Sequence, residues 1–178
     1  MTESRRLLQH FLAALAYRTQ KALRGAPESF ADFRAGANIR TPRELLMHMT
    51  SLMGYARTHL HGGEYQPPRV ETFAEEITRF HAMLAALRDD FANPDLEARI
   101  TDTQFLQGPL ADAMTHAGQL AMLRRLAGSP VASENFIHAD INARNVSERQ
   151  PEPAAPDEWW QPGLPPTPAG PPAPPDKT

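Results

Sequence analysis

The stretch that decides the fold is TFAEEITRFHAMLAALRDDF, residues 72–91. Its large apolar residues recur at alternating intervals of four and three, the spacing that keeps side chains on one face of an α-helix. They are Phe73, Ile77, Phe80, Leu84, Leu87 and Phe91. Thr72 and Glu75 have the spacing of a capping box at the start, and Asn93-Pro94 follows the end. The stretch therefore predicts an amphipathic helix with one buried face.

Three further segments show the same periodicity. The first covers residues 4–24 and ends at Gly25. The second begins with Thr41 as N-cap, Pro42 at the first helical position and Glu44 completing a capping box, and it ends at about residue 61. The last is expected from Gly108-Pro109 to Ala127. Four helices of about 20 residues predict an all-α four-helix bundle.

The connections between these helices are less regular. Residues 25–40 contain Phe30 and Phe33, which we expect to close one end of the bundle as a short helical turn. Residues 92–108 are expected to form a longer crossover, which would fit a bundle that does not strictly alternate up and down.

The chain is predicted to divide at about residue 150, into a bundle over 1–150 and a tail over 151–178. In the tail, 11 of 28 residues are proline, so an extended polyproline-like conformation is expected there. Trp159 and Trp160 are the only tryptophans, and we expect them to anchor this proline-rich extension on the bundle or on a neighbouring subunit.

Composition excludes several classes of function. The chain has 178 residues and a net charge of −3, so neither nucleic acid nor an anionic membrane is an expected partner. It has no cysteine, which excludes thiolate catalysis and thiolate metal ligands. We find no pattern of a signal peptide or a membrane span, and expect a cytoplasmic protein.

Two histidines and one aspartate are candidates for a metal site. Asp112 and His116 are four residues apart and therefore share one helix face, which Ala113, Ala117 and Leu120 make apolar. His48 falls on the expected core-facing row of the second helix. If those two helices are neighbours, the three side chains can meet at one end of the bundle and bind one ion. The alternative is structural, with His48 hydrogen-bonded in the core and Asp112 complementing the helix dipole.

Other candidates are weaker. His59 lies on the same face as His48, but about 16 Å further along the helix, too far to share an ion. His81 is a reserve ligand, and Tyr55 is expected to line a pocket. Four methionines are expected to fill the core (Met47, Met53, Met114 and Met122).

His48 near the start of a second helix, followed by His116-Ala-Gly-Gln-Leu in a fourth, resembles the DinB/YfiT-like superfamily of metal-dependent proteins. The resemblance covers most of residues 1–150 and is most specific from Asp112 to Pro130. It implies a four-helix bundle in which His48 and His116 bind a divalent metal, typically zinc or nickel. Asp112 stands where the family commonly has histidine, and because a carboxylate is a harder ligand, iron or manganese becomes plausible.

The resemblance leaves the reaction open. One hypothesis is a metal-dependent hydrolase or thiol transferase that acts on a small molecule or a low-molecular-weight thiol. A second is a non-catalytic stress-associated or interaction protein with a structural metal, and a third is a bundle in which Asp112 and His116 form a metal-free pair. A homodimer is also expected.

Overall fold

The computed structural model describes residues 2–156, and within that range the chain is all-α. The long helices are α1 (Glu3–Leu23), α2 (Pro42–His61), α3 (Phe73–Ala92) and α5 (Ala111–Leu126). Between α3 and α5 lie the short α4 (Asp102–Phe105) and the π-helical η2 (Leu106–Leu110). Two 3-10 turns complete the set, η1 (Glu28–Asp32) and η3 (Phe136–His138). The predicted all-α class is confirmed for the described residues.

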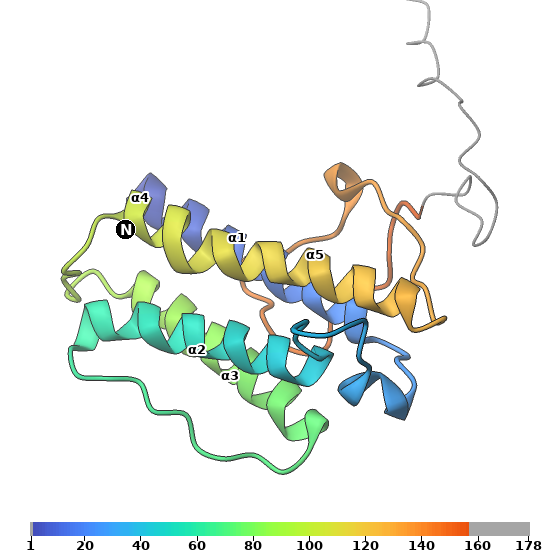
Figure 1. The fold of residues 1–178 in the computed structure, drawn as a ribbon. Helices are drawn as coiled ribbons and strands as arrows, with labels where there is room; N and C mark the ends of the chain where they lie inside the picture. The colour runs from blue at the N-terminus through green and yellow to red at the C-terminus, as the bar shows by residue number, and fades with distance from the viewer. Residues whose placement is uncertain (1, 157–178) are drawn as a thin grey trace, which may run out of the picture.

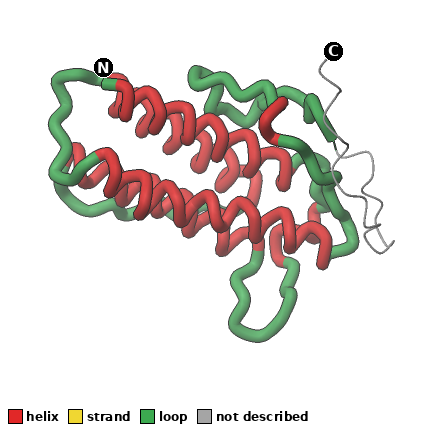
Figure 2. The backbone as a smooth tube through the Cα atoms, turned by 90° about the horizontal axis from the view of Figure 1, so that it is seen from above, coloured by secondary structure: helices red, strands yellow, loops and turns green. Residues whose placement is uncertain are grey.

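The four long helices form a bundle in which each packs against two neighbours (Figure 1). α1 lies beside α3 and α5, and α2 likewise lies beside α3 and α5. α1 and α5 run in one direction and α2 and α3 in the other. Residues 62–72 make this possible, because they carry the chain back along the bundle from the end of α2 to the start of α3 (Figure 1). Figure 2 shows the same helices from above, lying side by side with the loops around them. The long crossover of the bundle is therefore the 62–72 loop. The expectation that residues 92–108 would form it is wrong.

The helix starts follow the capping patterns of the sequence. The Thr41 and Thr72 hydroxyls accept bonds from the backbone N–H of Glu44 and Glu75, whose carboxylates accept in return from the two threonine N–H groups. Such a box satisfies donors that have no partner inside the helix. Both predicted starts are confirmed.

The predicted start of the fourth long helix, at Gly108-Pro109, is confirmed to within three residues, because α5 begins at Ala111. The short helix before it was not predicted: a third capping box, Thr101 with Gln104, begins α4 at Asp102, and η2 joins α4 to α5 across a kink at Gly108. Pro109 directly follows this kink. Proline lacks an N–H and clashes with the preceding turn, and the π-helical segment around it, with non-helical φ/ψ at Gly108, accommodates both effects.

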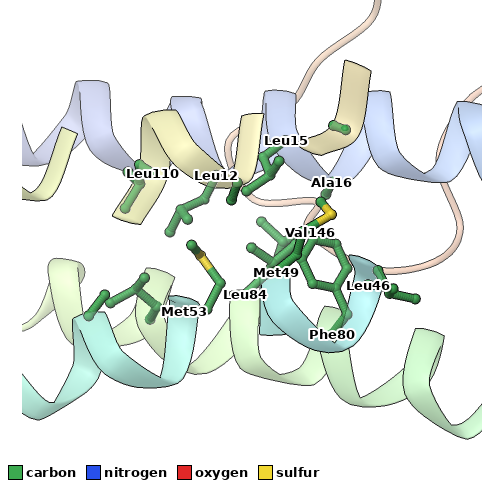
Figure 3. Packing of buried hydrophobic residues seen from close by; sticks show 14 of the residues in the cluster. Leu12, Leu15, Ala16, Leu46, Met49, Met53, Phe80, Leu84, Leu110 and Val146 are labelled. Carbon is green, nitrogen blue, oxygen red and sulfur yellow. The ribbon is translucent and has the colours of Figure 1, made fainter. Parts of the chain in front are cut away.

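The core runs the length of the bundle, and Figure 3 shows a part of it. Phe80 and Leu84 of α3 pack there with Leu12 of α1 and with Met49 and Met53 of α2. On α2 the buried row differs from the predicted one: it is the adjacent row, Leu46, Met49, Met53, Ala56 and Leu60. The expected row of Leu45, His48, Leu52, Tyr55 and His59 lies mainly at the edge of the core, where only Leu45 is buried.

Two smaller expectations have different outcomes. Phe30 is buried in η1 at the α1–α2 connection, as predicted. Of the methionines expected in the core, Met53 is buried, whereas Met47 and Met122 are exposed and that prediction is wrong for them.

After α5 the chain returns over the bundle. Val146 is buried in the core, and its carbonyl oxygen accepts a bond from the Nδ1 of His81 at 2.8 Å. Arg24 donates to the carbonyl oxygens of Gln150 and Pro151, so the contact with the bundle continues just past the predicted boundary. Trp159 and Trp160 lie outside the described residues, and their anchoring role stays a prediction. None of the helices within 2–156 is both long and apolar enough to cross a bilayer.

Candidate metal centre

His48, Asp112 and His116 lie together on the face that α2 and α5 share. The two helices run antiparallel and pack together, and this packing brings His48 of α2 beside Asp112 and His116 of α5. His48 lies in the second turn of α2, and Asp112 and His116 lie in the first two turns of α5. One ligand atom from each side chain lies within 4.8 Å of the other two.

The separations match what a shared ion requires. The Nε2 of His116 lies 3.2 Å from Oδ1 of Asp112, and the Nε2 of His48 lies 3.6 Å from Oδ2. Two ligands that are each about 2.1 Å from one ion are about 3.4 Å apart at a tetrahedral angle. The two imidazole centroids are 4.9 Å apart, with their planes at 75°. The two nitrogens and the carboxylate therefore form a donor set that could hold a divalent cation.

Gln119 orients one of the two imidazoles. Its Oε1 lies 2.7 Å from the Nδ1 of His116, so Nδ1 donates to it and Nε2 carries the lone pair that faces Asp112. Metal-binding histidines commonly use their other N–H in this way, which fixes both the tautomer and the ring orientation. This arrangement suits a metal ligand better than a direct hydrogen bond between His116 and Asp112. A neutral imidazole in this tautomer presents a lone pair, and not an N–H, to the carboxylate.

The electrostatic environment favours neutral His48. Burial, and then the positive charge of Arg40, lowers the pKa of His48, while Asp112 acts in the opposite direction. A metal binds the neutral form of imidazole, so a lower pKa reduces competition from protons near neutral pH.

The group is open toward solvent on one side. The exposed fraction of the side chain rises from 11% for His116 to 30% for His48 and 46% for Asp112. The prediction that Asp112 turns toward the core is therefore wrong: Ala113 and Ala117 take the buried positions, and the carboxylate lies at the rim. Three protein ligands on one side leave positions for water or a small molecule on the other.

The remaining histidines lie elsewhere, as their contacts show. His59 is not in the group, as expected, and its ring makes edge contacts with Tyr55 and Phe105. His81 is buried against Val146 and Gln20, so its role as a reserve ligand is ruled out by position. Tyr55 is exposed, and its ring packs edge-on against His59; its expected place in a pocket stays a prediction.

Two residues around the site were missed by the sequence analysis. Gln119 follows His116 by three residues, a spacing that places both on neighbouring positions of one helix face and was available as a signal. Arg40 precedes α2 and only the folded loop brings its charge near His48. The sequence contains no spacing rule that would have indicated it.

Comparison with protein-family models, with curated proteins and with solved structures found no match to this chain. The resemblance to DinB/YfiT-like proteins therefore stays a prediction from its motifs.

Proposed function

We propose that this chain is a DinB/YfiT-like metalloprotein in which His48, Asp112 and His116 bind one divalent cation, zinc or nickel, with iron or manganese as alternatives. The observation that carries the proposal is the convergence of three ligand atoms within 4.8 Å from two helices. The bond from His116 to Gln119 supports it, because it directs the Nε2 lone pair toward the other two ligands.

The exposure of the site favours catalysis over a purely structural metal. A structural ion is usually enclosed by four protein ligands, whereas here three ligands lie on one side and Asp112 is nearly half exposed. We therefore propose a metal-dependent hydrolase or thiol transferase that acts on a small molecule, with a low-molecular-weight thiol as one candidate substrate. A divalent cation at such a site would lower the pKa of a water or thiol that binds it.

The protein residues have separate roles in this proposal. His48 and His116 supply neutral nitrogen ligands, and Asp112 supplies a negative charge that offsets part of the charge of the cation. Gln119 is a positioning residue, because it acts on the site only through the ring of His116.

Elemental analysis of untagged protein, purified without chelators, tests the metal site. We expect about one divalent ion per chain, and His48→Ala should lower this content at least about tenfold. His59→Ala is a matched control, because His59 lies on the same edge of α2 but outside the group. Equal metal content in the wild type and in His48→Ala would refute the assignment.

A second measurement separates the two reaction classes. In cobalt-substituted protein, titration with cysteine should change the visible absorption spectrum if a thiol enters an open position of the metal. An unchanged spectrum would exclude the thiol-transferase half of the proposal. The predicted homodimer belongs to the same proposal, and a sedimentation measurement across micromolar concentrations checks it.

A further inference from the structure

An open surface pocket lies one helical turn from His48. Its lining residues are Arg34, Asn38, Ile39, Arg40 and Glu44. Glu44 and His48 are four residues apart on α2, so they lie on the same face and about 6 Å apart along the axis. The pocket and the candidate metal site are therefore neighbours on one surface of the protein.

The pocket has a net positive wall. Two guanidinium groups line it, against one carboxylate. That carboxylate, on Glu44, already accepts the backbone N–H of Thr41 at 2.8 Å in the capping box. The backbone N–H of Thr41 is the main cause that lowers the pKa of Glu44, and the charges of Arg34 and Arg40 lower it further, so both arginines lie near this carboxylate. The nearby Asp32 is paired with Arg43, at 3.0 and 3.1 Å, so its charge is largely neutralised.

The loop conformation brings the two arginines together. Asn38 adopts a left-handed conformation with φ of 61°, one that asparagine tolerates better than most residues, and it lies between them in the chain. Ile39, which is exposed, adds an apolar side chain to the lining of the same pocket. Guanidinium groups bind carboxylates and phosphates through paired N–H donors, so this pocket suits an anion attached to a small apolar body.

We propose that the Arg34/Arg40 pocket binds the anionic group, a carboxylate or a phosphate, of the small molecule whose other end reaches the site of His48, Asp112 and His116. The second half of this statement rests on the function proposed above. Anion binding by the pocket does not, because none of its lining residues belongs to the candidate metal site.

The test measures anion binding by the full-length protein with isothermal titration calorimetry, using inorganic phosphate and succinate as separate probes. Arg34→Gln and Arg40→Gln should each weaken binding of the preferred probe about tenfold, because each removes a charge-assisted contact. Arg69→Gln is the matched control: it removes the same charge from the exposed 62–72 loop and should leave the affinity unchanged. Tighter binding of phosphate would assign a phosphoryl group, and tighter binding of succinate a carboxylate.

Two results would overturn the proposal. One is the absence of binding of either probe to the wild type. The other is an anion affinity that stays the same in Arg34→Gln, Arg40→Gln and Arg69→Gln but is lost in His48→Ala. The anion would then bind a metal and not the pocket. Measuring metal content in each sample keeps the two proposals apart: anion binding that depends on Arg34 and Arg40 in a chain without metal would refute the proposed function and leave the pocket standing.

Discussion

Replacing the buried Arg124 by methionine should destabilise the fold by about 3 kcal/mol. The side chain of Arg124, only 3% exposed, lies near the end of α5 and donates to the carbonyl oxygens of Ser129, Ala22 and Arg24 at 2.7, 3.0 and 3.2 Å. Two of these carbonyls are at the C-terminus of α1, where the helix provides no donor for them. One guanidinium therefore joins the ends of two parallel helices.

The magnitude is worked from these three bonds. Two further bonds, from Nη2 to the Ser129 hydroxyl at 3.0 Å and to the Gly25 carbonyl at 3.5 Å, are left out of the sum because water can reach those partly or fully exposed residues. A hydrogen bond from a charged donor contributes about 1.5–3 kcal/mol, and the removal of a buried charge recovers part of its desolvation cost. Taking about 1 kcal/mol net for each bond, three bonds amount to about 3 kcal/mol. For a chain of this size that corresponds to a fall of about 6–12 °C in Tm.

Chemical denaturation followed by circular dichroism measures this loss, with Arg6→Met as the control. Arg6 is an exposed arginine of α1 that pairs with Glu3, so the same substitution there should cost less than about 0.5 kcal/mol. A loss at Arg124 no larger than that at Arg6 would refute the reasoning, because it would show that the carbonyl groups find equivalent partners in water.

The remaining predictions concern the metal, pH and packing. Asp112→Ala should lower metal affinity strongly and leave the helical content unchanged, whereas Asp112→His should restore binding with a preference shifted toward zinc; competitive titration with zinc and manganese measures both. Burial lowers the pKa of His81, so below about pH 6.5 the unfolded chain binds more protons than the folded one, and the free energy of unfolding should fall as the pH drops through that range. His81→Asn keeps a donor for Val146 and should flatten this dependence in denaturation curves recorded from about pH 7.5 to about pH 5. Gly54→Ala should destabilise the fold by about 1–2 kcal/mol, because the new Cβ would lie 2.3 Å from the Tyr65 ring. In a Tyr65→Ala background the same change should stabilise the fold, because only the better helix propensity of alanine remains. Thermal unfolding of the wild type, the two single variants and the double variant gives the sign of each effect.

Features that depend on neighbours in the chain were predictable from the sequence. The capping boxes at Thr41 and Thr72 involve residues three apart, so their bonds form within one turn and need no tertiary contact. The Thr101/Gln104 box follows the same rule and was overlooked because Gly108-Pro109 resembled a start. Gly108-Pro109 nevertheless marks a real break, since Gly108 has non-helical φ/ψ and α5 begins just after it.

The phase of α2 was not predictable in the same way. Two adjacent rows both follow the helical period, and the row that contains His48 and Tyr55 was taken for the buried one. The row of Met49 and Met53 is buried instead, because it is the more uniformly apolar surface that the neighbouring helices can cover. Periodicity defines how wide a stripe is, but the direction in which it faces depends on where the other helices lie.

The sequence by itself determined the helical class, where most helices begin and end, and which residue types were able to bind a metal, because these depend on local spacing and chemistry. Only the tertiary structure decided that His48 meets Asp112 and His116 across two antiparallel helices, that His81 does not, and that the site opens to solvent beside Arg40. The physical reason is that such contacts join residues far apart in the chain. They depend on the direction that the 62–72 loop imposes on α3 and on the packing of whole helix faces, which no short sequence pattern encodes.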